Sequence, residues 1–518
     1  MQRAFILESS VKKIFVSAFL AASLLTNVTF GQKPKPTPSA AKPAVAETGD
    51  VNVPIFTKTL ANGLEVIVYQ DSSLPIVTAE MAVRNGSFTE PPELNGLSHL
   101  YEHMFFKSND AIILRRCEMR MPDPRCGNSA TLKARVGDAS YLDKIGDLGL
   151  VYNGSTREEV VNYYYTTTSP YIEQAIRTLN DAIRYPVFDE GELNDEKKVV
   201  IGEMDRQDAN PYSDLNRVLN EKLFFKYPTR KIPIGTRESV QSATTEKMRL
   251  IQSRYYVPNN AALVVTGDVK PEQVFAMAEK IMGSWPRRAV DPFKEIPLVE
   301  HPPLPKSEGV VIDKRSGDSG EDQNIAITIG WQGPSIGKDN AATYAADVFS
   351  YILTQPDSKF QRNMVDSGLT TGAGIGYYTQ RNVGPINVVL QTTPAKAKAA
   401  LTAVYAEIAQ FASPTYFSDE ELENSKTILA ANELYDRERS SEYTHTLGFW
   451  WSSTGIDYFR GYQKNLNAVS RADITRYVNT YIIGKPHVGI ALVSPAVKTQ
   501  ANLTEADLIG STAKAATH

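Results

Sequence analysis

The amino-acid sequence predicts an α+β protein that consists of two similar domains, each with a mixed sheet and helices. Three observations support this prediction. β-Hairpin signals and long helical patterns alternate within the first half of the chain, which favours α+β layers over a purely parallel sheet. Two segments with the same order of local patterns close the two halves, and a proline-rich segment separates them.

The first half opens with a β-hairpin signal. Asn62-Gly63 is a dipeptide typical of tight turns, and alternating apolar residues flank it on both sides. A later alternating run ends at Asn85-Gly86, and longer stretches beyond it have helical patterns. The expected elements are strands at residues 56–60, 64–69 and 76–84, and helices at residues 171–185 and 189–208.

The two halves end in similar segments. Residues 238–269 and residues 465–497 each combine a capped helix, a tyrosine-rich exit, a proline turn and a β-branched strand. Self-similarity at this long spacing predicts a duplicated domain, although helix, turn and strand also follow one another by coincidence. Six prolines between Pro286 and Pro305 break helices and interrupt sheet ladders, so this segment is the expected linker.

The N-terminus has the pattern of an export signal. Lys12 and Lys13 precede an apolar run of 12 residues, Ile14 to Leu25, and small residues follow it. Because a bilayer-spanning helix needs about 20 residues, we expect a signal peptide cut before Gln32 and no stable membrane anchor. A buried core helix is the alternative. The expected location of the protein is therefore exported, either periplasmic or secreted.

The composition restricts the class of protein. The formal net charge is -4, whereas nucleic-acid-binding proteins usually carry a basic surplus, so no nucleic-acid partner is expected. Cys117 and Cys126 are the only cysteines in the sequence. Two cysteines exclude both a disulfide-scaffold protein and a metal site with four cysteine ligands.

Two of the six histidines lie four residues apart, in the segment His99-Leu-Tyr-Glu102-His103. On a helix, His99 and His103 would lie one turn apart on one face, where two imidazoles can bind one zinc ion. Glu102 would lie about 60° to the side of His99, so it could approach a water at the metal without being a ligand. The alternative is an amphipathic helix with two incidental histidines.

A zinc site of this kind needs a third protein ligand. Glu196 and Glu203, on the expected helix at 189–208, share a helix face but lie about 10 Å apart along its axis. One would be the ligand and the other would orient a ligand from outside the metal's own shell. Their spacing does not choose between them, and a solvated charged face is the alternative for both.

These residues resemble the insulinase/pitrilysin family of zinc metallopeptidases, the inverzincins, which include mitochondrial processing peptidase. The family signature is the inverted motif His-x-x-Glu-His. The similarity extends to three further segments, and it is strong over residues 54–285 and weak over residues 309–497. The matching segments are GSFTEPPELNGLSHLYEHMFFK, NGSTREEVVNYYYTT and EKKVVIGEM, followed by the segment that closes the first half.

The resemblance implies a duplicated metallopeptidase fold that encloses a cleft and binds one Zn²⁺ per chain. It implies that Glu203 is the third ligand, that Glu196 is its outer-shell helper and that Glu102 is the general base. It also places Asn153 near the bound substrate. The implied activity is that of an exported zinc metalloendopeptidase that hydrolyses short or unfolded peptides. A non-catalytic peptide-binding or scaffold subunit of the same family is the alternative.

The sequence departs from the family pattern between the motif and the distal glutamate. There are 99 residues between His103 and Glu203, more than in typical members, and an insertion at about residues 108–141 accounts for the difference. Cys117 and Cys126 lie in this insertion. In an exported chain they are expected to form a disulfide rather than to remain free thiols.

A second departure lies in the other half. Active members often have an arginine and a tyrosine seven residues apart there, but Arg362 is followed at that spacing by Leu369, and the tyrosine position aligns near Thr371. Either Tyr377 or Tyr378 compensates, or another chain supplies the missing donor. We therefore expect a heterodimer with a homologous metal-less subunit, or else a homodimer, acting on peptide substrates.

The sequence thus predicts six consecutive parts of the chain. They are a signal peptide at 1–31, a proline- and alanine-rich linker at 32–50, a zinc-bearing catalytic domain at 51–285, a proline-rich linker at 286–308, a second, metal-free domain at 309–500 and a tail at 501–518.

Overall fold

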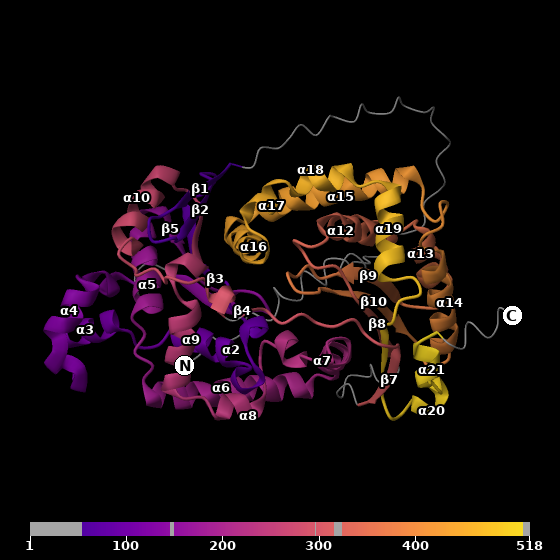
Figure 1. Ribbon diagram of the computed structural model, residues 1–518, viewed down its shortest axis with the longest axis horizontal. Helices are drawn as coiled ribbons and strands as arrows, with labels where there is room; N and C mark the ends of the chain where they lie inside the picture. The colour runs from indigo at the N-terminus through magenta and orange to yellow at the C-terminus, as the bar shows by residue number, and fades with distance from the viewer. Residues whose placement is uncertain (1–53, 146–149, 296, 315–323, 511–518) are drawn as a thin grey trace, which may run out of the picture. The chain divides into compact units, whose positions relative to one another are not determined.

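The structure of the protein, a computed structural model, describes residues 54–145, 150–295, 297–314 and 324–510. The expected signal peptide at 1–31 and linker at 32–50 lie outside the described residues. The described part is an α+β fold with two mixed sheets, as the sequence predicts (Figure 1). In the described part of the chain, no helix is both long and apolar enough to span a bilayer.

The first sheet has six strands in the order β1-β2-β6-β3-β5-β4, and the second has five in the order β7-β11-β8-β10-β9. The strands of the first are β1 (Ile55–Thr59), β2 (Glu65–Gln70), β3 (Ile76–Val83), β4 (Val151–Thr156), β5 (Val161–Thr168) and β6 (Ala261–Gly267). Those of the second are β7 (Glu308–Asp313), β8 (Ile325–Gln332), β9 (Gly372–Tyr377), β10 (Pro385–Thr392) and β11 (Val488–Val493).

The two sheets share one topology. Without the extra strand β1, each sheet places its first strand beside its last in parallel, and then its second, fourth and third strands follow in antiparallel order. The same connection order in two halves of one chain is the structural form of the duplication that the sequence predicts.

Helices pack on both sheets, and the two expected at 171–185 and 189–208 are present, with ends within one residue of the expected ones. The hairpin of β1 and β2 turns at Asn62-Gly63, where Gly63 has a φ of 89°, a conformation that favours glycine. The first-half helices are α2 (Leu97–Phe105), α3 (Asp110–Glu118), α4 (Ser129–Val136), α5 (Ile172–Arg184), α6 (Glu190–Ala209), α7 (Pro211–Leu223), α8 (Arg237–Gln241), α9 (Thr245–Tyr255), α10 (Pro271–Met282) and α11 (Pro292–Glu295). The second-half helices are α12 (Asn340–Thr354), α13 (Lys359–Gln361), α14 (Ala397–Gln410), α15 (Asp419–Glu438), α16 (Ser440–Ser453), α17 (Ile456–Arg460), α18 (Tyr462–Ala468), α19 (Arg471–Tyr481), α20 (Lys498–Ala501) and α21 (Glu505–Leu508).

One helix from each half packs against the sheet of the other half. Helix α7, from the first half, packs its leucines against Val488 and Ile490 of β11 in the second sheet. Helix α16, from the second half, packs on β3 and β6 of the first sheet (Figure 1). The sequence does not predict this exchange. The domain limits at 51–285 and 309–500 stay a prediction.

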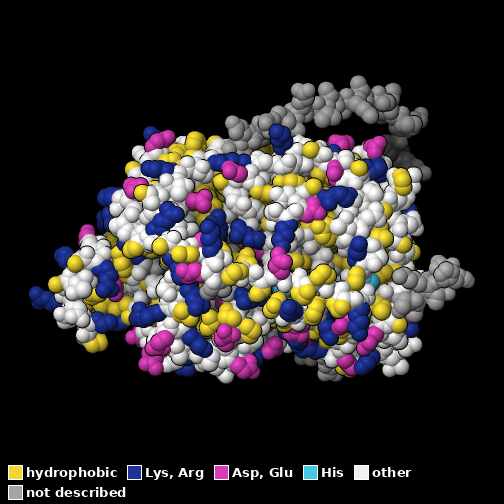
Figure 2. Space-filling model, in the orientation of Figure 1, with side chains coloured by type: hydrophobic (Ala, Val, Ile, Leu, Met, Phe, Trp, Pro, Cys, Tyr) yellow, Lys and Arg dark blue, Asp and Glu magenta, His cyan; other side chains and the backbone are white. Residues whose placement is uncertain are grey.

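The expected insertion at residues 108–141 contains α3 and α4, which enclose a small apolar cluster of their own. Cys117 and Cys126 form a disulfide in the structure, with their Cα atoms 5.3 Å apart. Lys and Arg side chains gather over α3 and α4 on the face shown in Figure 2, and several of them pair with acidic residues in or just after the insertion. The insertion therefore has an apolar cluster and a disulfide of its own, apart from the main core.

A buried ion pair fastens α16 to the first sheet. The carboxylate of Glu80 on β3 is 0% exposed, and an imidazole N–H of His445 on α16 donates to it. Burial alone would lower the pKa of His445, but the charge of Glu80 and this hydrogen bond outweigh burial and raise it. Arg157 opposes the rise and Glu442 supports it.

This pair predicts a pH-dependent stability. Because the pKa of His445 is raised on folding, its contribution is fully present below the unfolded histidine pKa of about 6.5 and is lost as the pH rises through the folded pKa. His445→Gln should lower the free energy of unfolding by about 3–5 kcal/mol below that pH, since it leaves Glu80 buried without its cation. Urea unfolding on both sides of about pH 6.5 measures the loss.

The exposed Glu442 on the same helix provides the matched control. Glu442→Gln should change the free energy of unfolding by less than about 0.5 kcal/mol, and Glu80→Gln combined with His445→Gln should recover part of the loss. An unchanged pH profile in His445→Gln would show that the pair is not the source of the slope.

Candidate metal centre

Helix α2 carries the His-x-x-Glu-His motif, and a buried carboxylate fixes where the helix begins. Gly96 precedes α2 with a φ of 88°, and a Cβ there would lie 2.6 Å from the carbonyl oxygen of Ile234. Glu90 accepts the backbone N–H groups of Gly96 and Ser98 at 2.8 Å and 2.6 Å. Burial raises the pKa of Glu90 to about 7. Glu90, which holds the start of the motif helix in place, was not predicted from the sequence.

Helices α2 and α6 bring two histidines and one glutamate together. The Oε2 atom of Glu203 lies 3.5 Å from Nε2 of His99 and 3.7 Å from Nε2 of His103. The three candidate ligand atoms lie within 4.8 Å of one another. Zinc bonds of about 2.0–2.2 Å in a tetrahedral arrangement put neighbouring ligand atoms about 3.4 Å apart. Two imidazoles and a carboxylate at this spacing fit a catalytic zinc site.

Glu196 contacts the opposite side of His103. Its Oε2 atom lies 2.9 Å from Nδ1 of His103, and its Oε1 atom accepts from Lys107 at 2.5 Å. Nδ1–H of His103 then donates to Glu196, which leaves Nε2 with a lone pair directed toward Glu203. The structure therefore separates two glutamates that the sequence spacing could not distinguish.

The electrostatics of the two histidines differ. Burial and the neighbouring His103 lower the pKa of His99 to about 3, which keeps its imidazole neutral. Burial also acts to lower the pKa of His103, but the hydrogen bond to Glu196 and the nearby carboxylates outweigh it and raise that pKa. For Glu196, burial acts to raise the pKa, and the contacts with His103 and Lys107 lower it overall.

Glu102 lies beside this cluster but outside it. Its side chain is buried, and its Oε2 atom accepts the Thr156 hydroxyl at 2.7 Å. Burial raises the pKa of Glu102 to about 7, partly offset by that hydrogen bond. A carboxyl group with a pKa near neutrality can both take and return a proton, which suits a general base.

Asn153 lies on strand β4, close to the cluster, but its side chain is turned to its own backbone. Its Oδ1 atom accepts the N–H of Gly154 at 2.9 Å. Side chains alternate along a strand, so Gly154 and Thr156 face one way and Asn153 faces the other. The two residues that contact Glu102 are therefore Gly154 and Thr156. Neither residue was predicted from the sequence, although the alternation in Asn-Gly-Ser-Thr indicates that they share a face.

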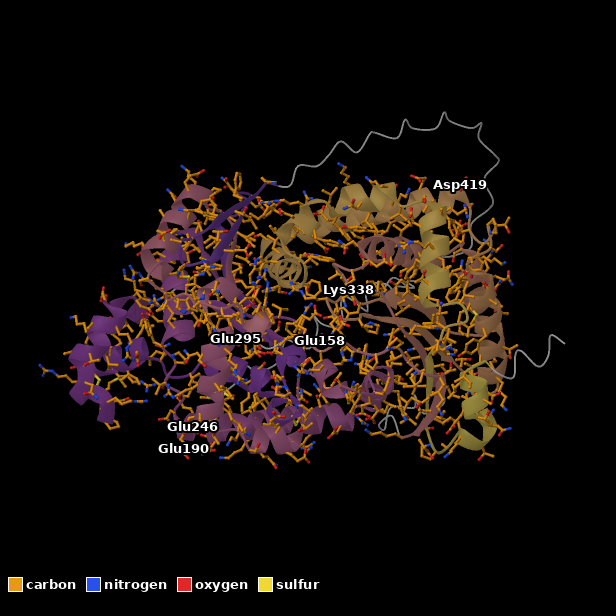
Figure 3. The ribbon with its side chains drawn as sticks, in the orientation of Figure 1. Glu158, Glu190, Glu246, Glu295, Lys338 and Asp419 are labelled. Carbon is orange, nitrogen blue, oxygen red and sulfur yellow. A yellow bond between two sulfur atoms is a disulfide. The ribbon has the colours of Figure 1, made fainter. Side chains whose placement is uncertain are left out.

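Residues of the second half form hydrogen bonds to the turn that follows β4. The carboxylate of Glu159 accepts the backbone N–H groups of Arg381 at 2.8 Å and Asn382 at 3.1 Å. Tyr378 donates its hydroxyl to Glu158, which Figure 3 labels, at 3.2 Å. These contacts tie the end of β4 to the sheet of the other half.

Arg362 and the two tyrosines that could compensate, Tyr377 and Tyr378, are engaged elsewhere. Arg362, at the end of α13, donates to the carbonyl oxygen of Asp357, and Tyr377 donates to that of Pro334 at 2.9 Å. With Tyr378 bonded to Glu158, neither tyrosine hydroxyl is directed to the histidine cluster. Leu369 and Thr371 provide no phenol at the expected spacing.

Two protein-family models match consecutive parts of the chain. A family model described as Insulinase (Peptidase family M16) matches residues 65–112 and 130–236, and one described as Peptidase M16 inactive domain matches residues 242–429. The gap between 112 and 130 falls inside the insertion and contains both cysteines.

Relatives and solved structures agree with this match. Zinc protease PqqE of Helicobacter pylori is 22% identical over 82% of this chain and 89% of its own length. The probable mitochondrial-processing peptidase subunit beta of Arabidopsis thaliana is 25% identical to this chain. The match covers 47% of this chain and 41% of that relative. The crystal structure of a protease from Helicobacter pylori has a TM-score of 0.71 at 20% identity, covering 85% of this chain and 99% of that one. The chain belongs to the insulinase family of peptidases, family M16.

Proposed function

We propose that this chain is the zinc-bearing subunit of an exported peptidase that hydrolyses short or unfolded peptides. The observation that carries the proposal is the convergence of Nε2 of His99, Nε2 of His103 and Oε2 of Glu203, with Glu102 beside them. A relative of similar length is named a zinc protease, which supports the same metal here.

Zinc, when bound by this donor set, supplies a Lewis acid that polarises the scissile carbonyl and activates a water. Glu102 takes the proton of the attacking water and then delivers it to the leaving amine. Glu196 holds the ring of His103 in one orientation and one tautomer. The chain's own residues therefore provide the ligands, the base and the orienting group.

Strand β4 provides the surface for the peptide. It is the last strand of the first sheet, so one of its edges has no neighbouring strand among the described residues. Val151 and Tyr152 on it are 60% and 55% exposed, so the start of the strand is accessible to a ligand. An extended peptide can add to such an edge through main-chain hydrogen bonds, with loose preference for sequence. Asn153 on this strand remains our candidate substrate contact.

The experiment that tests the function measures bound zinc and peptide cleavage on the same preparation. The chain recovered from the exported fraction should begin at Gln32, contain one zinc per chain and cleave an unstructured fluorogenic peptide. A chelator should abolish cleavage, and added zinc should restore it. Stoichiometric zinc without cleavage, alone or with a partner, would favour the non-catalytic peptide-binding subunit.

The missing arginine and tyrosine pair leads to the proposed partner. Loss of a donor that stabilises the developing oxyanion costs a factor of about 10²–10³ in rate. Because Tyr377 and Tyr378 are engaged elsewhere, we infer that a homologous metal-less subunit supplies this donor. A relative named as a peptidase subunit supports the inference.

The partner prediction is tested with the zinc-loaded chain alone. It should have less than about one hundredth of the kcat/KM of the complex isolated from its native source. Full activity of the isolated chain, lost on Tyr377→Phe or Tyr378→Phe, would contradict the heterodimer, and a self-associating active chain would favour the homodimer.

A further inference from the structure

We propose that Thr156 and Gly154 on strand β4 are positioning residues for Glu102, and that they couple the placement of the base to the strand on which the peptide docks. The inference rests on the proposed function and deepens it. It assigns a role to two residues of β4 that neither the motif nor its spacing identifies. Their contacts with Glu102 join elements that are more than 50 positions apart in the sequence.

The first observation is a hydrogen bond across elements. The hydroxyl of Thr156 donates to Oε2 of Glu102 at 2.7 Å, and the Glu102 side chain is buried against β4. A carboxylate accepts hydrogen bonds at both oxygens. The Thr156 hydroxyl occupies one lone pair of Oε2 and so fixes the orientation of the carboxylate, whose remaining lone pairs can accept the proton of the attacking water. Thr156 keeps its own proton throughout, so the proton passes from the water to the Glu102 carboxylate and then to the leaving amine.

The second observation is the close approach of β4 at Gly154. A Cβ at this position would lie 2.8 Å from Cγ and 3.0 Å from Oε1 of Glu102. It would also lie 3.1 Å from the carbonyl oxygen of Asn162 on β5. Gly154 is not among the residues with a positive φ. The position therefore requires glycine for space rather than for backbone conformation, and any side chain there would displace the base or the strand.

Together Gly154 and Thr156 fix the position of the Glu102 carboxylate. Gly154 and Thr156 lie two positions apart on one strand, so both face α2, where Glu102 lies. One residue leaves room for the carboxylate and the other holds one of its oxygens. A peptide that adds to the free edge of β4 would fix the strand backbone, and with it the position of Glu102. Peptide docking and alignment of the base are therefore a single event.

A purely structural role for Thr156 predicts a different result. A hydroxyl that only satisfies a buried carboxylate would affect the stability of the fold when it is removed. A positioning role affects kcat, while KM, zinc content and the unfolding midpoint stay close to their original values. The two roles are separated by measuring all four quantities on the same variants.

The experiment uses the full zinc-loaded chain, with its partner if activity requires one. Thr156→Val keeps the side-chain shape and a good strand former but removes the donor. It should lower kcat by about tenfold to a hundredfold, the loss that corresponds to one hydrogen bond to a charged group. KM and zinc stoichiometry should stay unchanged. Thr156→Ser, which keeps the hydroxyl, should recover kcat to within about threefold.

Gly154→Ala and Gly127→Ala form the matched pair. Gly154→Ala should lower kcat with zinc retained, because its methyl group meets Glu102. Gly127→Ala makes the same change in the insertion, where a Cβ would meet no atom within 4 Å, and should keep kcat within about threefold. Wild-type kcat in Thr156→Val, or an equal loss in Thr156→Ser, would overturn the positioning role. Inactive wild-type protein with full zinc would instead overturn the proposed function itself.

Discussion

Replacing Glu203 with alanine is expected to remove zinc from the protein, whereas replacing Glu196 with alanine should only weaken zinc binding. Oε2 of Glu203 lies within 3.7 Å of both imidazole Nε2 atoms, so its loss leaves two ligands for a metal that needs at least three. Glu196 instead contacts Nδ1 of His103, and losing such an orienting partner typically costs 10- to 100-fold in metal affinity, or about 1.4–2.7 kcal/mol.

Equilibrium dialysis against a zinc buffer, followed by elemental analysis, measures both effects. Glu190→Ala is the matched control, because Glu190 lies exposed in the first turn of the same helix, α6 (Figure 3). It should leave zinc affinity unchanged. Stoichiometric zinc in Glu203→Ala together with zinc loss in Glu196→Ala would reverse the assignment of the two glutamates.

Glu102→Gln should keep its zinc and lose most of its activity. Glutamine has the shape of glutamate and can still accept the Thr156 hydroxyl, but it cannot take a proton from water. Removing a general base lowers the rate by about 10²–10⁴. The measurement is kcat/KM on an unstructured peptide, with zinc content determined on the same sample.

Glu93→Gln provides the control for this loss. Glu93 is exposed just before α2, so the substitution makes the same chemical change near the motif but away from the cluster. It should have full activity. If Glu102→Gln also lost zinc, Glu102 would be a ligand and the general base would have to lie elsewhere.

The sequence could predict the parts of the site that lie within one helix. His99, Glu102 and His103 follow from helical spacing alone, because their relative directions are set by 3.6 residues per turn. It could also predict that Glu196 and Glu203 share a face of α6. Which of the two contacts the histidines depends on how α6 packs against α2, and this tertiary arrangement has no local sequence signal. From the sequence, only the family resemblance distinguishes the two glutamates.

Other features could not be predicted from local patterns. Strand alternation puts Gly154 and Thr156 on one face, but no local pattern shows that this face meets Glu102, which lies on a helix far away in the sequence. Asn153 was assigned by resemblance, and its bond to its own backbone is set by the pleat of β4. The three strands and two helices predicted with bounds in the first half, at 56–60, 64–69, 76–84, 171–185 and 189–208, end within one residue of the observed ends, because hairpin and helical periodicities are local signals.

Because α7 and α16 each pack on the sheet of the other half, the chain cannot be divided at the linker between the halves without exposing buried groups. Cutting the chain at residues 286–308 would leave the first fragment without α16, so the buried carboxylate of Glu80 and the hydroxyl of Thr266 would lose their partners. The second fragment would lose α7, and Val488 and Ile490 would face water. Neither half is therefore expected to fold on its own, although the two sheets share one topology. Heating should melt both halves in one cooperative transition, which calorimetry can distinguish from two.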